Sequence, residues 1–303
     1  MSKLSVNLCG VHFDNPVIMA SGTFGFGREY AAFYPLSTLG GIACKAITPQ
    51  PRLGNPPPRI AETPAGILNS VGLQNPGAEK FCKHDLPWLY EQGTRIIVNV
   101  AGASLVDYCT VVEQLDDSFI DMIELNISCP NVKHGGASFG ATPEAAAEVT
   151  AAVRKITKKP LMVKLTPNVS DIGAIACAVE SAGADAVSLI NTLLGMKIDI
   201  KTRRPILRNN TGGLSGPAVL PIAVRMVSEV YRHVNIPIVG MGGVSTWEDA
   251  VELMLAGATA VQVGTANFTD PLAPVKIIAG LKDYVESEKL SSVTELTGKA
   301  ELY

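Results

Sequence analysis

Residues 237–266 read PIVGMGGVSTWEDAVELMLAGATAVQVGTA. A short apolar run at 237–240 is typical of a buried strand, 246–256 has helical periodicity, and 260–263 is a second apolar run. Gly257 follows the helical segment directly, where a left-handed glycine commonly ends a helix. The spacing predicts a strand–helix–strand unit with parallel strands, because a helical crossover returns the chain to the same end of a sheet.

The same alternation extends over the whole chain. It predicts strands at 17–19, 41–45, 95–100, 122–126, 161–165, 186–190, 237–240 and 260–263, and helices at 80–91, 105–115, 142–157, 171–182, 218–234, 246–256 and 274–286. Residues 29–34 give only a weak helical signal. The strands are almost wholly apolar, which suits a parallel sheet covered on both faces.

Eight such units in 303 residues predict a TIM (β/α)8 barrel that forms a single α/β domain over 1–303. A doubly wound open sheet is the alternative. The resemblance of AGADAV at 182–187 to AGATAV at 256–261 favours the barrel. Two long segments, 48–77 and 191–216, follow the second and sixth strands, so we expect them on the C-terminal face. Residues 4–8 and 11–13 are expected to form a small hairpin that plugs the opposite end.

Composition excludes several classes of protein. Hydrophobic residues make up 47% and charged residues 17%, with a formal net charge of -3, so neither a disordered chain nor an electrostatic nucleic-acid binder is expected. No run of roughly 20 apolar residues predicts a membrane span, and the first residues lack the apolar core of a secretory signal. The six widely spaced cysteines include no C-x-x-C, which argues against a zinc or iron–sulfur site. We therefore expect a cytoplasmic protein.

Glycines follow the last two predicted strands. Gly242 and Gly243 come after the seventh strand, and Gly264 with Thr265 comes after the eighth. These are the usual positions of a phosphate site in this fold, because glycine lets backbone N–H groups approach an anion. Ser245 stands where a dinucleotide fingerprint would need its third glycine, and no Walker A pattern occurs.

Polar side chains gather at the ends of five strands. The fourth strand runs into NISCPN at 126–131, and Cys129 in this Pro- and Asn-rich loop is poorly placed for core packing. The other strand-end residues are Lys45, Asn99, Lys164 and Asn191. Either lysine alone would also suit a surface position. Together on one rim, they indicate a site for an anionic or electron-rich cofactor.

These motifs closely resemble those of the class 1 dihydroorotate dehydrogenases, FMN enzymes of pyrimidine synthesis, over nearly the whole chain. The matching stretches are 20–25 (ASGTFG), 54–59 (GNPPPR), 69–75 (NSVGLQN), 126–131 (NISCPN), 240–243 (GMGG) and 264–266 (GTA). The segment 131–136 (NVKHGG), with Phe139 and Gly140, is similar to the NAD-linked type 1B. The fumarate-linked type 1A, which usually has a segment rich in Pro, Gly and Lys there, is the alternative type. The membrane-bound class 2 enzymes use Ser as base and carry an N-terminal extension.

The resemblance implies a role for each site residue. One FMN per chain would be bound by Ser21, Gly22, Lys45, Ala46, Asn99, Asn126, Lys164 and Ile190, with its phosphate at Gly216, Gly242, Gly243, Gly264 and Thr265. The substrate would be held by Lys45, Asn69, Ser70, Val71, Gly72, Leu73, Asn126, Asn131, Asn191 and Thr192. Ala46 replaces a frequent hydroxyl residue, so only a backbone contact is expected there.

In the implied reaction Cys129 takes the proton from carbon 5 of dihydroorotate, and a hydride passes from carbon 6 to the flavin. An ordinary thiol titrates near ~8.5, so a nearby lysine or concerted hydride loss must assist. Lys164 would stabilise negative charge on the reduced ring. Residues 131–140 are expected to act as a lid over the site.

The sequence shows no second cofactor site through which electrons could pass from the flavin to NAD. It has no G-x-G-x-x-G after a strand and no cysteine cluster. The resemblance implies a partner subunit carrying FAD and a [2Fe–2S] cluster, docked on a largely apolar surface, and a homodimer core within a heterotetramer.

Three other hypotheses remain at this point. A related dihydropyrimidine dehydrogenase would share Cys129, although Lys45 and residues 69–73 favour orotate. An aldolase could use Lys164 as a Schiff base in a phosphate-binding barrel. A non-catalytic binding subunit could have kept the barrel, but the complete set of Cys129, Lys164 and Asn residues argues against it.

Overall fold

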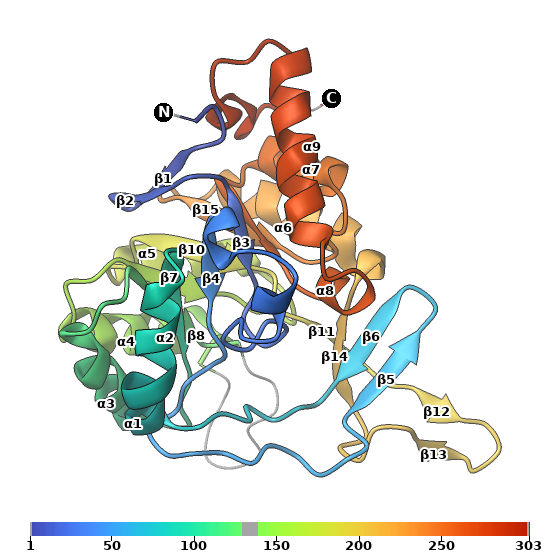
Figure 1. Cartoon of the computed structure of the whole chain (residues 1–303). Helices are drawn as coiled ribbons and strands as arrows, with labels where there is room; N and C mark the ends of the chain where they lie inside the picture. The colour runs from blue at the N-terminus through green and yellow to red at the C-terminus, as the bar shows by residue number, and fades with distance from the viewer. Residues whose placement is uncertain (1, 129–138, 302) are drawn as a thin grey trace.

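A closed barrel of eight parallel strands forms the centre of the molecule (Figure 1). The computed structural model describes residues 2–128, 139–301 and 303. In chain order the barrel strands are β3 (Val17–Met19), β4 (Gly41–Ala43), β7 (Arg95–Val100), β8 (Met122–Asn126), β9 (Leu161–Lys164), β10 (Ala186–Leu189), β15 (Ile238–Met241) and β16 (Ala260–Val263). β10 pairs with both β9 and β15, and β16 pairs with β3, so the ring is complete. The predicted TIM barrel is confirmed.

Near-continuous apolar sequence explains why these strands lie at the centre. Each strand is flanked by helices on the outside and by facing strands on the inside, so nearly every residue in it is buried. Four strands have the predicted bounds. Three others, which the sequence extends to 45, 165 and 190, end one or two residues earlier because the chain turns into the loops of the rim. β15 runs from 238 to 241 rather than from 237 to 240.

Helices cover the outside of the barrel. They are α1 (Ala78–Lys80), a π-helical turn (Phe81–Asp85), α2 (Leu86–Glu91), α3 (Leu105–Asp116), α4 (Pro143–Arg154), α5 (Ile172–Ser181), α6 (Leu220–Tyr231), α7 (Trp247–Ala256), α8 (Ala266–Thr269) and α9 (Ala273–Ser287). Short 3-10 turns occur at Tyr30–Ala32, Leu36–Thr38, Pro217–Val219 and Val293–Leu296. Residues 29–34, with their weak helical signal, therefore form only a 3-10 turn in the first unit.

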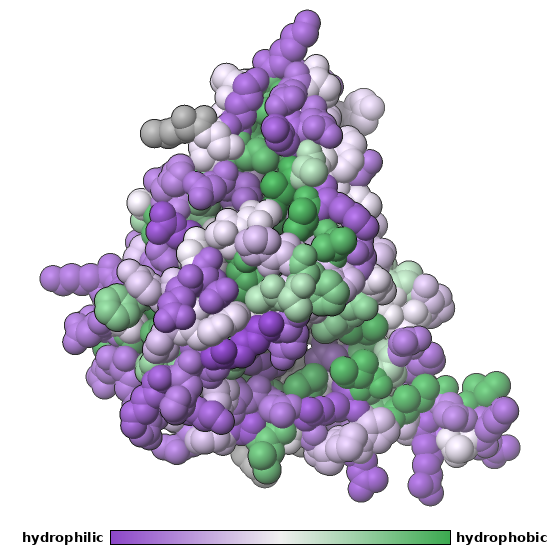
Figure 2. Space-filling model, in the orientation of Figure 1, coloured by the Kyte–Doolittle hydropathy of each residue, from purple (hydrophilic) through white to green (hydrophobic). Residues whose placement is uncertain are grey.

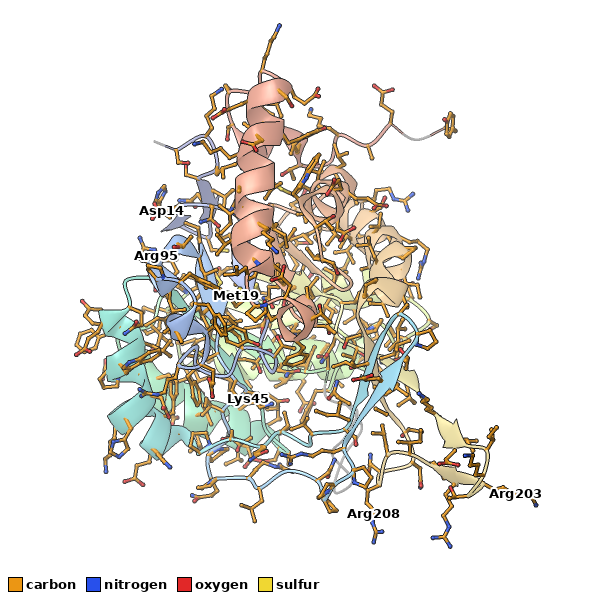
Figure 3. All side chains as sticks on the ribbon, turned by 45° about the vertical axis from the view of Figure 1, so that its right-hand side comes forward. Asp14, Met19, Lys45, Arg95, Arg203 and Arg208 are labelled. Atoms are coloured by element: carbon orange, nitrogen blue, oxygen red, sulfur yellow. The ribbon has the colours of Figure 1, made fainter. Side chains whose placement is uncertain are left out.

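The predicted hairpin closes the amino-terminal end of the barrel. β1 (Val6–Leu8) and β2 (Val11–Phe13) pair antiparallel. Cys9 Sγ donates to the carbonyl of Asp185 at 3.1 Å, and Arg95 Nε donates to the carbonyl of His12 at 2.7 Å. Figure 3 shows Arg95 at this end of the molecule and Lys45 toward the opposite end.

The two long segments form a second sheet rather than irregular loops. β5 (Ile60–Thr63), β6 (Gly66–Asn69), β11 (Leu193–Gly195) and β14 (Gly212–Ser215) lie in the order β11-β14-β6-β5, all antiparallel. Ala61, Leu68 and Leu207 form its small separate core. The sequence did not predict these strands, because they are three or four residues long and rich in glycine.

A hairpin of β12 (Ile198–Asp199) and β13 (Arg204–Pro205) projects from this sheet, and Figure 3 shows Arg203 at its outer end. Ile198 and Ile200 are 53% and 88% exposed. Figure 2 shows hydrophobic residues on the part of the surface that the hairpin and the neighbouring sheet occupy. In the described ranges, no helix combines the length and apolar character needed to cross a membrane.

Both glycines of the internal repeat have the left-handed backbone that the sequence predicts, with φ of +99° at Gly183 and +131° at Gly257. At Gly257 space is also restricted, since a Cβ would lie 2.4 Å from Cγ of Tyr231. Gly10 has φ of +86°, but a Cβ added there would have nothing within 4 Å. Comparing alanine substitutions at Gly10 and Gly257 therefore separates the cost of a left-handed backbone from the cost of steric overlap with Tyr231.

We predict that Gly257→Ala destabilises the protein more than Gly10→Ala. A left-handed alanine costs roughly 1–2 kcal/mol, and overpacking against Tyr231 adds about 1–3 kcal/mol. Urea unfolding of the two variants measures the difference in free energy of unfolding. Equal losses would show that Tyr231 moves aside freely.

Candidate active site

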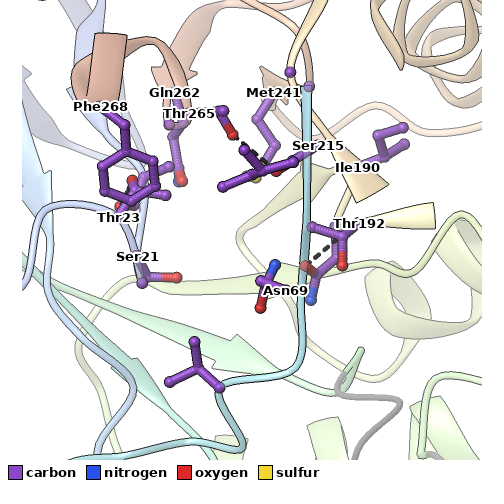
Figure 4. Close-up of a pocket in the computed structure, with 18 of the residues that line it drawn as sticks. Ser21, Thr23, Asn69, Ile190, Thr192, Ser215, Met241, Gln262, Thr265 and Phe268 are labelled. Carbon is purple, nitrogen blue, oxygen red and sulfur yellow. Dashed lines mark hydrogen bonds between the residues drawn. The ribbon is translucent and has the colours of Figure 1, made fainter. Parts of the chain in front are cut away.

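A pocket of about 230 Å³ opens at the carboxyl ends of the barrel strands, between the barrel and the four-stranded sheet. Figure 4 shows residues from both sheets around it. Most of the residues that the sequence predicts for the site line this pocket: Ser21, Gly22, Lys45, Ala46, Asn69, Val71, Gly72, Leu73, Asn126, Lys164, Ile190, Asn191, Thr192, Gly216, Gly242, Gly243, Gly264 and Thr265. Segments more than 200 residues apart in sequence therefore share one cavity.

One end of the pocket is basic and rich in amides. The parallel register of β8 and β9 places Asn126 beside Lys164. Lys164 is only 4% exposed, and its Nζ donates to Oγ of Ser21 at 3.2 Å. Lys45 lines the same cavity, close to Gly22, where a Cβ would lie 3.8 Å from its Nζ. This end suits an anionic or electron-rich group.

The other end is built from glycine backbone and hydroxyl groups. Gly242 and Gly243 have φ of +119° and +84°, and a Cβ on Gly243 would lie 2.6 Å from Cβ of Leu220. Thr265 Oγ1 donates to Oγ of Ser215 at 2.8 Å, and Figure 4 shows these two side chains facing one another. Only glycine fits at position 243, and backbone amides together with hydroxyls are typical of a phosphate site.

Amides and a hydroxyl connect the rim between these strands. Asn126 Oδ1 accepts from Oγ of Ser128 at 2.9 Å, and Asn191 Nδ2 donates to the same Oγ at 2.6 Å. The rings of Phe139 and Tyr108 meet edge to face, with their centroids 5.6 Å apart, and the N–H of Gly140 donates to the carbonyl of Ile127 at 2.9 Å. These contacts fix residues 126–128 and 139–140 at the rim.

Two predicted site residues do not line the pocket. Asn99 is fully buried behind Asn126, whose Nδ2 donates to its Oδ1 at 3.1 Å. Ser70 is also fully buried, and its Oγ has no hydrogen-bond partner among the described residues. Cys129 and Asn131 lie outside the described residues, as does the predicted lid apart from 139–140.

Comparison with known proteins agrees with this geometry. The family profile described as Dihydroorotate dehydrogenase matches residues 3–285. The chain belongs to the dihydroorotate dehydrogenase family.

Its relatives include proteins named "Dihydroorotate dehydrogenase B (NAD(+)), catalytic subunit". That of Alkaliphilus oremlandii is 55% identical over 297 residues, covering 98% of each chain. That of Geobacillus kaustophilus is 53% identical over 301 residues, covering 99% of this chain and 96% of the relative. That of Listeria monocytogenes serotype 4a is 54% identical over 297 residues, covering 98% of each chain.

Several residues in or next to the pocket of this dihydroorotate dehydrogenase family member were not predicted from the sequence. Gln262 and Ser215 line the cavity, and Glu124 lies directly beneath it. Gln262 and Glu124 each interrupt an otherwise apolar strand, and that interruption is the signal that could have found them. Ser215 carries no such signal, because it belongs to the second sheet.

Burial favours the protonated thiol at four of the five described cysteines. Burial raises the pKa of Cys44 far above its ordinary value, and burial with the nearby Asp185 carboxylate raises the pKa of Cys9 to about 12. Burial also raises the pKa of Cys82 and of Cys109. These four thiols are therefore poorly suited to act as thiolate bases at neutral pH.

We predict that Cys44 and Cys9 of the native protein resist iodoacetamide at pH 8, because alkylation requires the thiolate and both pKa values lie well above 8. Timed labelling followed by peptide mass spectrometry measures the rate at each cysteine. The urea-unfolded chain is the control, in which all sites should react. Native labelling of Cys44 at the unfolded rate would contradict the burial argument.

Proposed function

We propose that this chain oxidises dihydroorotate to orotate in pyrimidine biosynthesis, with one FMN in the barrel pocket, as the catalytic subunit of an NAD-linked enzyme. The observation that carries the proposal is the pocket itself. One cavity joins a glycine and hydroxyl cradle to an end bearing Lys45, Lys164 and several amides. Family membership over residues 3–285 supports the same reaction.

FMN fits the residues present. Gly242, Gly243 and Thr265 would hold the phosphate, and their cradle excludes any side chain larger than hydrogen at Gly243. Ser21, Asn126 and Lys164 would contact the flavin ring at the other end of the cavity. When bound, FMN supplies an acceptor for the hydride. The ammonium of Lys164, buried beside Ser21, would favour negative charge on the ring.

The substrate would lie between the flavin and the second sheet. Lys45 would bind the carboxylate of dihydroorotate. Asn69, Asn126 and Asn191 line the pocket from three different strands or strand ends and supply both donors and acceptors for an imide edge. Val71, Gly72 and Leu73 would close over the substrate. Ser70 is fully buried, and its backbone N–H donates to the carbonyl of Arg59 at 2.8 Å, so it would hold this stretch in place rather than contact the substrate.

Cys129 is the proposed general base. It follows Ser128 directly in sequence, and Ser128 is hydrogen-bonded to Asn126 and Asn191 at the pocket rim. The thiolate would remove the proton from carbon 5 while carbon 6 loses its hydride, which balances the two hydrogens lost by the substrate. Asn131 would complete the substrate contacts.

We further propose that electrons leave through a partner subunit that carries FAD and a [2Fe–2S] cluster, within a cytoplasmic heterotetramer built on a homodimer of this chain. The name "catalytic subunit" of the relatives supports a partner. The absence of a dinucleotide fingerprint from the sequence supports a separate site for NAD.

The visible spectrum of the purified chain tests the proposed function. We expect a flavin spectrum that is bleached anaerobically by dihydroorotate and unchanged by dihydrouracil. Bleaching by dihydrouracil instead would indicate a dihydropyrimidine dehydrogenase. A colourless protein that binds no added FMN would overturn the proposal and favour a non-redox barrel.

Cys129→Ala is expected to retain FMN but to lose dihydroorotate oxidation by roughly 10²–10⁴-fold, the usual contribution of a positioned base. Anaerobic stopped-flow reduction of the flavin measures the loss. Cys177→Ala is the matched control, since its Sγ donates to the carbonyl of His233 on the outside of the barrel. That control should keep the wild-type rate, and full activity in Cys129→Ala would remove Cys129 from the mechanism.

The isolated chain is expected to reduce an artificial dye with dihydroorotate but not to reduce NAD. The phosphate-type cradle of the pocket is assigned to FMN, and the sequence holds no dinucleotide fingerprint that would give NAD a site of its own. Absorbance at the NADH band, with NAD as the sole acceptor, measures this. Robust NADH formation without a second polypeptide would contradict the proposal that a partner subunit is needed to reduce NAD.

A further inference from the structure

A fully buried carboxylate lies inside the barrel beneath the pocket. Glu124 of β8 is 0% exposed. Its Oε1 accepts from Oγ of Ser188 at 2.9 Å and from Nε2 of Gln262 at 2.7 Å. Its Oε2 accepts from Nδ2 of Asn99 at 2.5 Å and lies 3.8 Å from Nζ of Lys164. Four other barrel strands, β7, β9, β10 and β16, thus converge on one side chain.

Glu124 and Lys164 form a largely buried ion pair. Lys164 is 4% exposed, and Glu124 is its one ion-pair partner among the described residues. A buried charge is strongly unfavourable without a partner, and removing one member of a buried pair leaves the other uncompensated. The ammonium that lines the pocket is therefore balanced from below by Glu124.

The same carboxylate ends a chain of hydrogen bonds that runs in one direction. Asn191 Nδ2 donates to Ser128 Oγ, which donates to Asn126 Oδ1. Asn126 Nδ2 donates to Asn99 Oδ1, and Asn99 Nδ2 donates to Glu124. An ionised carboxylate can only accept, so it fixes the orientation of the Asn99 amide and, through it, that of Asn126.

We propose that Glu124 is a positioning residue for this site: it balances the charge of Lys164 and fixes which amide atoms the Asn126 side chain presents to the ligands. The identity of those ligands rests on the proposed function. Glu124 itself does not line the pocket, so it would act through Lys164 and Asn126.

Glu124→Gln separates the two roles. Oε1 of Gln262 is buried and has no hydrogen-bond partner among the described residues, so this amide can rotate and accept from the new NH2 group. The hydroxyl of Ser188 can also accept. The remaining oxygen of the introduced glutamine can then face Asn99 and Lys164. The variant keeps the direction of the hydrogen-bond chain and removes only the charge.

The first test is the midpoint potential of FMN in the loaded chain. With the negative charge gone, reduction of the flavin above Lys164 becomes more favourable. We expect at least a tenfold change in the reduction equilibrium of Glu124→Gln, about 30 mV for a two-electron couple. Ser188→Ala removes one hydrogen bond to Glu124 without changing charge and should keep the wild-type potential. A wild-type potential in Glu124→Gln, or an equal shift in Ser188→Ala, would overturn the charge role.

The second test needs neither flavin nor substrate. Urea unfolding of the apo chain compares Glu124→Gln, Lys164→Met and the double variant. If the two charges compensate one another, the double variant is less destabilised than the two single variants together predict. We expect its unfolding equilibrium constant to differ at least tenfold from the value obtained by multiplying the two single effects. It should also recover folded protein if Glu124→Gln alone fails to fold. Additive losses would refute the pairing. A wild-type chain that is colourless and binds no added FMN would refute the proposed function while leaving this cycle decisive.

Discussion

Closure of eight parallel strands into a ring is the constraint on which the rest of the molecule depends. All eight strands run in one direction, so all their carboxyl ends meet at one rim, and the strand-end residues Lys45, Asn126 and Lys164 become neighbours. The other rim needs only to be closed, and the β1–β2 hairpin closes it. The pocket therefore lies at one rim of the barrel and the closing hairpin at the other, because all the strands run in one direction.

The interior of this barrel is not wholly apolar. Glu124, Ser188 and Gln262 occupy central positions on three strands, each fully or almost fully buried. Most buried polar groups in proteins are hydrogen-bonded, and here one carboxylate accepts from several donors at once, although Oε1 of Gln262 has no partner among the described residues. These hydrogen bonds and the ion pair with Lys164 offset the cost of burying the carboxylate, and they connect this layer to the residues that line the pocket.

The second sheet completes the cavity. β6 contributes Asn69 and β14 contributes Ser215, and these strands pair with one another although the chain between them crosses most of the barrel. Without this pairing the strand-end residues would face open solvent. A site shielded on one side by a barrel and on the other by an added sheet can exclude water from a hydride transfer.

The sequence by itself determined the barrel, the two ends of the pocket and the family. Apolar strands, helical crossovers and glycines such as Gly243 carry that information locally, because each is a property of a few consecutive residues. The residue types at Lys164 and Asn126 likewise indicated the chemistry of the rim.

Only the tertiary structure decided how these residues are supported. It placed Asn99 behind Asn126 rather than in the cavity, joined two glycine-rich segments into one sheet, and set Glu124 beneath Lys164. None of these relations is local. Each depends on contacts between strands distant in sequence. In the barrel the register is set by closure of the whole ring, and in the second sheet by the pairing of β6 with β14.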